Sequence, residues 1–165
     1  YTGQSLTLTF AIDPLGGSGG ARLALDEVSL GSTAPDLWVD GGLPPSSPPD
    51  AVFGLAVQAG NRGGGQAAGA TLTVSLPVGL SYAGADPLPL TTGPFVVWQL
   101  PAMPGGAPAP TIALTLSVDS GAAGAVLTPS FMIASATPEL ELVNNTWQAS
   151  LFIGYRVHLP AAKAP

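Results

Sequence analysis

The sequence of 165 residues lacks cysteine entirely and contains very little charge. Without cysteine there are no disulfides and no thiolate metal sites, so the chain is indifferent to the redox state of its compartment. Only 8% of the residues are charged, with four Lys and Arg against ten Asp and Glu, and no basic run occurs. A chain without basic runs cannot neutralise a phosphate backbone, so we expect no nucleic-acid partner.

Long apolar runs and helical periodicity are also missing. No stretch approaches the roughly 18 uninterrupted apolar residues that span a bilayer, so we expect no membrane span. The chain starts at Tyr1 without a signal-peptide pattern, from which we expect a processed or excised product. The single histidine, His158, stands seven residues from the end of the sequence with no evident partners. We therefore predict that the chain is not an enzyme and uses no cofactor.

What the sequence does contain is short alternating runs separated by its 22 Gly and 18 Pro residues. Apolar and small polar residues alternate with a period of two, which is typical of β-strands bounded by turns. The pattern predicts an all-β antiparallel sandwich with a strand-free connector at 41–50. The predicted strands are 5–12, 21–30, 36–39, 51–59, 71–76, 95–100, 111–118, 126–136 and 146–159. The predicted core comprises Leu55, Val57, Leu72, Val74, Leu76, Trp98, Ile112, Leu114, Leu116, Phe131, Ile133, Trp147 and Leu151.

Several short motifs between residues 35 and 153 carry a family resemblance. They are PDLWV, AGNRGGGQAAG, SLPVGLSYAGA, VVWQL, TIALTLSV and NNTWQA. With these motifs the chain resembles the immunoglobulin-like "conserved repeat" domain of unknown function of bacterial and archaeal surface proteins. It is also similar to the bacterial cell-adhesion-related domain. The resemblance implies an Ig-like sandwich over 35–153 and an extracellular address at the cell surface.

The two ends of the chain carry weaker resemblances. Residues 1–34 form a predicted N-terminal β-hairpin extension, and LTLTF and LDEVSL within it look like the last two strands of a carbohydrate-binding-type jelly roll. Residues 154–165 form a C-terminal strand extension and tail, of which YRVHLP resembles the ends of secreted proteins from filamentous bacteria. Together these features predict a structural subunit of a surface filament or pilus-like assembly. The alternative is a carbohydrate-binding or adhesion module, or a spacer, of a larger secreted protein.

We expect the partner to be a second copy of the chain, joined by β-strand addition. A lone hairpin is too small to be stable in water, so a neighbour must cover its apolar face. The run 146–159 alternates over fourteen residues, which is longer than a typical strand, and we expect its end to dock on a neighbour. The alternative is a bend at Gly154 that folds the strand back. The predicted contact residues are Leu6, Leu8, Phe10, Leu23, Leu25, Tyr155, Val157 and Leu159.

Sites for metal or sugar have less support. Asp26 matches the aspartate that helps to bind calcium in some relatives of the jelly roll, and Glu139 with Glu141 could hold a cation, although a solvated acidic edge is the favoured interpretation. Asn144 opens a formal glycosylation sequon. Trp38, next to the Pro-rich connector, is the one tryptophan predicted to be free for a carbohydrate ligand.

Overall fold

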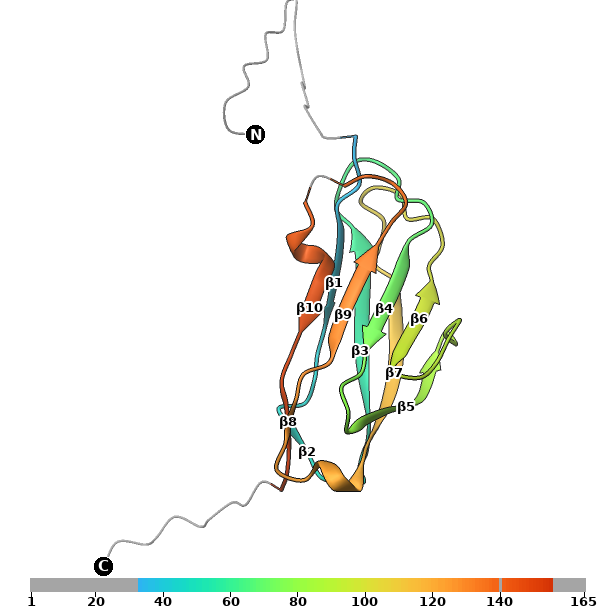
Figure 1. The fold of residues 1–165 in the computed structure, drawn as a ribbon. Coiled ribbons are helices and arrows are strands. Elements are labelled where there is room, and N and C mark those ends of the chain that lie inside the picture. The colour runs from blue at the N-terminus through green and yellow to red at the C-terminus, as the bar shows by residue number, and fades with distance from the viewer. Residues whose placement is uncertain (1–32, 140, 156–165) are drawn as a thin grey trace, which may run out of the picture. The chain divides into compact units, whose positions relative to one another are not determined.

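The computed structural model describes residues 33–139 and 141–155 (Figure 1). The strands are β1 (Leu37–Gly41), β2 (Ser46–Ser47), β3 (Val52–Asn61), β4 (Thr71–Ser75), β5 (Leu80–Asp86), β6 (Phe95–Gln99), β7 (Thr111–Val118), β8 (Val126–Leu127), β9 (Ser130–Ala134), β10 (Thr146–Gln148) and β11 (Leu151–Ile153). The two 3-10 helices are η1 (Ser120–Ala122) and η2 (Val143–Asn145). Among these residues no helix is long and apolar enough to cross a membrane.

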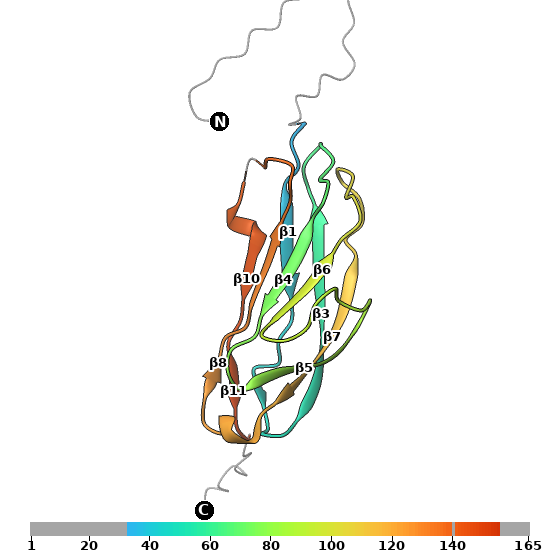
Figure 2. The same cartoon turned by 45° about the vertical axis from the view of Figure 1, so that its right-hand side comes forward.

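Two four-stranded sheets pack face to face, which confirms the predicted all-β sandwich. The first has the order β1-β3-β7-β5 and the second the order β10-β9-β4-β6, and all their pairs are antiparallel. A small sheet, β2-β11-β8, lies at one end. Figures 1 and 2 show that the described chain enters at the end where β1 begins and leaves at the opposite end after β11.

The core forms between the two sheets as the alternation predicts. On β3 and β7, Leu55 pairs with Leu114 and Val57 with Ile112, and these side chains point toward β4, β9 and β6 of the second sheet. All predicted core residues are buried except Trp147, which is half-buried and packs against the core. Burial of each large aliphatic side chain contributes about 1.5–3 kcal/mol.

Trp147 closes one side of the sandwich. Its ring lies 4.7 Å from the ring of Phe131, centroid to centroid, within the second sheet. A Cβ added to Gly41 of β1 would meet the same ring at 3.0 Å. The missing side chain of Gly41 therefore lets β10 approach β1 closely, and the two sheets are joined along this side.

The predicted C-terminal strand 146–159 is wrong as one unbroken strand. The chain forms β10 on β9 and then β11 between β2 and β8, with Ala149 and Ser150 between them, and it bends at Gly154. Alternation continues through the break because both strands bury their odd-numbered residues, so periodicity could not reveal the change of partner. Residues 156–159, including Val157 and Leu159, lie outside the described residues.

Two further predictions of strands need correction. The predicted strand 126–136 is split into β8 and β9 around Thr128 and Pro129. The connector predicted to be strand-free contains β2, which pairs in parallel with β11. The carbonyl oxygen of Pro45, which precedes β2, accepts a hydrogen bond from Phe152 N–H (3.2 Å). The carbonyl oxygen of Ser47 accepts one from Gly154 N–H (2.9 Å). Proline lacks a donor but keeps its carbonyl, so a Pro-bounded pair can still serve as an edge strand.

The sequence prediction missed β5 altogether. Its residues, LSYAGAD, include Gly and Ala, which have low strand propensity, and its register with β7 shifts between Tyr82 and Gly84. The predicted hairpin at 5–30, with Leu6, Leu8, Phe10, Leu23, Leu25 and Asp26, lies outside the described residues, as does His158.

Candidate functional site

The acidic loop before η2 is used to cover the free edge of β1. Glu139 accepts a hydrogen bond from Leu37 N–H at its Oε2 atom (2.8 Å). Asn145 Nδ2 donates to both carboxylate oxygens of Glu139, at 3.2 and 3.3 Å. Because β1 is the outermost strand of its sheet, the loop satisfies a backbone donor that would otherwise face solvent.

Asn144 is held in the same way by the residue that precedes β1. Its Nδ2 atom donates to Asp36 Oδ1 at 2.7 Å. This nitrogen is the atom that glycosylation would modify, so the predicted sequon is engaged in a tertiary contact. The Oδ1 atoms of Asn144 and Asn145 are both buried without a hydrogen-bond partner, at a cost of about 1–3 kcal/mol for each unsatisfied acceptor.

Glu141 is directed to its own loop. Its Oε1 atom accepts from the N–H groups of Leu142 and Val143, both at 3.1 Å, at the start of η2. The structure thus gives Glu139 and Glu141 different sets of amide donors. Over 33–139 and 141–155, no three His, Cys, Asp or Glu side chains come close enough together to hold a metal ion.

Asn61 is a buried amide that joins three segments at this end of the sandwich. Its Oδ1 atom accepts from the N–H groups of Asp36 and Gly63, both at 3.0 Å. Its Nδ2 atom donates to the carbonyl oxygens of Gly65 (2.7 Å) and Met103 (2.9 Å). With all its hydrogen-bonding positions used, Asn61 is a structural residue that fixes the glycine-rich loop beside β1.

Trp38 does not offer a free platform for a sugar. It pairs with Gly60 across β1 and β3, and a Cβ at Gly60 would meet the indole Nε1 at 2.7 Å. The guanidinium carbon of Arg62 lies 4.6 Å from the ring centroid, in a cation–π contact. The indole therefore lies against Gly60 and already has a cation as its stacking partner.

The edges of the second sheet are also protected. Leu90 N–H donates to Val97 O (2.7 Å) and Val97 N–H to Thr91 O (3.1 Å), so the 90–91 segment pairs with the outer side of β6. The other edge strand, β10, has only three residues and lies next to β1, where Trp147 closes the side. Short or covered edges of this kind prevent unwanted strand pairing.

Strand β5 is different because it pairs with β7 alone and no described segment covers its other side. The turn Pro77–Leu80 positions it: Leu80 N–H donates to Pro77 O (3.1 Å), and Gly79 adopts a φ of 103°. A residue with a side chain is strained at that φ, and its Cβ would come within 3.1 Å of Ala122 and Leu127. The glycine therefore directs the chain into an edge strand that remains open.

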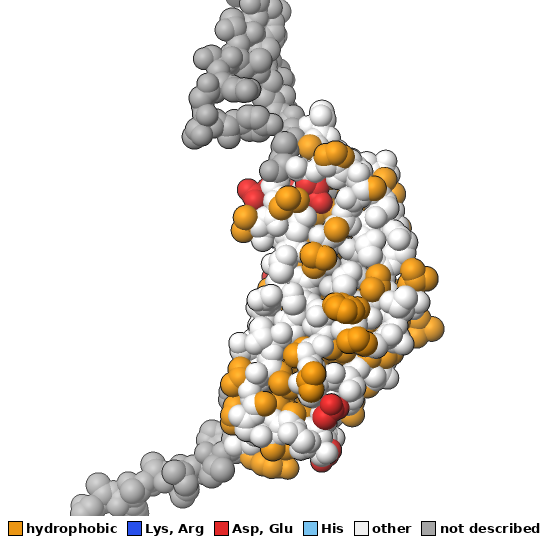
Figure 3. Space-filling view, viewed as in Figure 1, with side chains coloured by type: hydrophobic (Ala, Val, Ile, Leu, Met, Phe, Trp, Pro, Cys, Tyr) orange, Lys and Arg blue, Asp and Glu red, His pale blue; other side chains and the backbone are white. Residues whose placement is uncertain are grey.

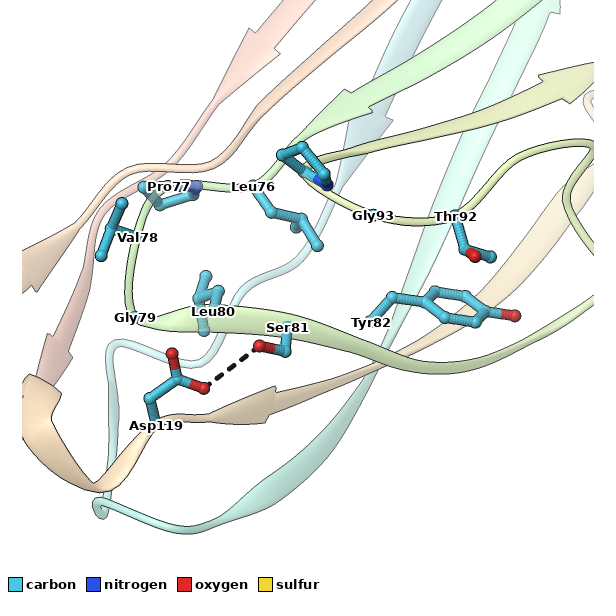
Figure 4. A pocket seen from close by; sticks show the side chains of 11 residues that line it. Leu76, Pro77, Val78, Gly79, Leu80, Ser81, Tyr82, Thr92, Gly93 and Asp119 are labelled. Atoms are coloured by element: carbon cyan, nitrogen blue, oxygen red, sulfur yellow. Dashed lines mark hydrogen bonds between the residues drawn. The ribbon is translucent and has the colours of Figure 1, made fainter.

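A groove of about 520 Å³ lies at the start of this open strand, beside Leu80, Ser81 and Tyr82. Figure 4 shows Leu80 and Tyr82 of β5 on one side and the loop through Thr92 and Gly93 on the other, with Leu76 at the base. Leu76 and Leu80 are buried and Tyr82 is half-buried, so the wall is largely apolar. Ser81 and Asp119 also line the groove, where Ser81 Oγ donates to Asp119 Oδ1 at 3.1 Å. The sequence analysis missed this groove, although the turn PVGL and the alternation of Leu80, Ser81 and Tyr82 were signals for it.

Exposed apolar side chains accompany the groove. Val78 at its rim is 97% exposed, and Val126 and Phe152, which pair across β8 and β11, are 62% and 44% exposed. Tyr155, one of the predicted contact residues, is 74% exposed. Figure 3 shows apolar side chains scattered over the face of the second sheet and at the end where the chain leaves, with no basic side chain on that face. Arg62 is the only basic residue of the described part.

No protein-family model matches the sequence, and no curated protein matches it either. Solved structures do resemble it. The CARDB domain of a Pyrococcus furiosus protein, crystallised in complex with di-metal ions, is 14% identical with a TM-score of 0.56, covering 77% of this chain and 95% of that one. A solution structure of that CARDB domain is 15% identical, with a TM-score of 0.49 and coverages of 74% and 97%. AvmM, which catalyses macrocyclization in alchivemycin A biosynthesis, is 15% identical, with a TM-score of 0.49 and coverages of 74% and 91%.

The first of these likenesses shows that the chain has a CARDB-like fold, and at such identities it shows the fold alone. The metal ions in that crystal structure belong to that domain and are not carried over to this chain. Asp36, Glu139 and Glu141 each accept a hydrogen bond from an amide N–H. Among the described residues, no three His, Cys, Asp or Glu side chains lie close together.

Proposed function

We propose that this chain is a structural, non-enzymatic module of an extracellular surface assembly, in which copies join by β-strand addition. The observation that carries the proposal is the contrast between the sheet edges. β1 is covered by Glu139, β6 by the 90–91 segment and β10 is short, whereas β5 has seven residues and an unpaired side. An unpaired strand beside an apolar groove is a template for a further strand.

The surface composition supports permanent contact with neighbours. The outer face of the first sheet presents small residues over β3, β7 and β5, where Gly54, Thr115 and Gly84 lie side by side. With Arg62 as the only basic residue of the described part, little electrostatic patterning is available for steering other partners. The entry and exit of the described chain at opposite ends suit modules arranged in series.

The described sandwich also fills its own core. Phe131, Leu72 and Leu116 are fully buried by residues of the same chain, so no strand from outside is needed to complete the fold. Strand addition at β5 would extend the first sheet and leave the core unchanged. The carbohydrate-binding alternative has less support, because Trp38, its candidate platform, is already stacked with Arg62.

The test is to locate the protein and its assemblies on the cells that make it. Gold-labelled antibodies against the purified chain, viewed by electron microscopy on intact cells, are expected to decorate extended surface structures. Labelling confined to the cell interior, in permeabilised cells only, would contradict the proposal.

A further inference from the structure

The groove beside β5 has the shape and polarity of a receptor for one particular kind of strand. Leu76, Leu80 and Tyr82 give its lining apolar side chains, and Ser81, hydrogen-bonded to Asp119, forms the polar part of its rim. A strand added to β5 would continue the alternation of Leu80, Ser81 and Tyr82, because neighbouring strands of a sheet share one apolar and one polar face. The occupant must therefore alternate between apolar residues on one side and small polar residues on the other.

Residues 5–12 of this chain, SLTLTFAI, have that pattern. Leu6, Leu8 and Phe10 share one parity, and Thr7 and Thr9 share the other. The segment has eight residues and β5 has seven. It contains no proline and no charge, either of which would hinder strand addition.

We infer that residues 5–12 of one copy add to β5 of a second copy and place Leu6, Leu8 and Phe10 toward the groove. This inference rests on the proposed function and names its donor and acceptor. Threonine side chains then lie on the outer face, continuous with Ser81 and Ser117 of the first sheet.

The position of the groove suits a segment that comes from a second copy. The described chain begins at the end where β1 starts, whereas the groove includes Val78 and Asp119, next to η1 at the opposite end. The twenty residues 13–32 extend to about 66 Å at most, which exceeds the about 33 Å spanned by ten-residue β3, so the length of this linker does not select between the two copies. In a series of copies in which the β1 end of one follows the η1 end of the previous one, residues 5–12 of the following copy come next to the groove.

The absence of cysteine allows a direct test with the full chain. Single variants Leu8→Cys and Phe10→Cys are each mixed with an isotope-labelled Thr92→Cys variant and oxidised, with Thr7→Cys and Thr9→Cys as matched controls of the opposite parity. Thr92 is exposed on the groove rim, so its replacement should not disturb the fold. A disulfide forms only between Cα atoms about 4.4–6.8 Å apart. We expect mixed disulfide dimers from Leu8→Cys or Phe10→Cys at several times the yield of both controls.

The outcomes separate this inference from the proposed function. Oligomers that form with equal cross-linking at all four positions would overturn the donor segment and leave the surface module standing. A double variant Leu8→Cys and Thr92→Cys that closes only within one chain would overturn the exchange between copies. A wild-type chain that stays monomeric at all concentrations would contradict both.

Discussion

At the scale of single residues, the fold depends on a few polar side chains that satisfy backbone groups at the entry end. Asn61 is 3% exposed and connects the approach to β1, the glycine-rich loop and the 103 loop. Glu139 and Asn145 do the same for the edge of β1. Asn61 makes four hydrogen bonds with one side chain, whereas Asn145 acts through the carboxylate of Glu139.

Replacement of Asn61 by alanine is therefore expected to be costly. The change leaves the N–H of Asp36 and the carbonyl of Met103 without their partners in a buried place. We expect a loss of about 2–4 kcal/mol in the free energy of unfolding, measured by urea denaturation. Gln58→Ala on the same strand is the control, because Gln58 is exposed, and it should change stability by less than about 0.5 kcal/mol. Equal effects of the two variants would contradict the assigned role.

At the scale of elements, glycines decide where strands and side chains can approach each other. Gly60 of β3 lies under the indole of Trp38, whereas Gly54 of the same strand has only Leu114 O within 4 Å, at 3.9 Å. Both glycines are on the outer face of the first sheet, so they form a matched pair.

Alanine at these two positions is expected to have opposite effects. Gly60→Ala would push the indole off β3 and break its contact with Arg62, at a cost of about 1 kcal/mol. Gly54→Ala meets no obstacle and should be neutral or raise stability by about 0.4–1 kcal/mol, because the unfolded chain loses freedom. Thermal unfolding followed by circular dichroism measures both. A higher melting temperature for Gly60→Ala than for wild type would refute the packing of Trp38.

The elements also show what the sequence could and could not predict. Strands β3, β4, β6 and β7 were predictable because Leu55, Leu72 and Leu114 alternate with polar or small residues toward a single core. The break between β10 and β11 was not, since Trp147, Leu151 and Ile153 keep one parity while the strand changes its partner. Strand β5 escaped because its bulge and its glycine weaken the pattern. The acidic loop was recognised at Glu139, but its partners Leu37 and Asn145 depend on tertiary contacts.

At the scale of the whole molecule, the sandwich is self-contained, and we propose that it associates through the open side of β5 and through its terminal segments. The exit end carries the exposed side chains of Phe152 in β11 and Tyr155 after it, and the sequence continues to Val157 and Leu159. Exposed apolar side chains such as Phe152 and Tyr155 form a surface that a neighbour can cover.

Charges at the exit end are expected to weaken association without loss of the fold. The double variant Val157→Asp and Leu159→Asp should reduce oligomer formation at least tenfold while the melting temperature stays within about 2 °C of wild type. His158→Asp, of the opposite parity, serves as the control and should associate nearly as wild type does. If the double variant unfolds instead, the segment belongs to the core of its own sandwich, and the predicted contact with a neighbour fails.

Sedimentation velocity shows whether copies of the chain join through residues 1–30, which lie outside the sandwich in sequence. The full chain of 16.3 kDa and a chain without residues 1–30 are compared over a range of concentrations. The account predicts that the full chain forms species of two or more copies, and that the shortened chain sediments as a folded monomer. A shortened chain that associates as strongly as the full chain would contradict it.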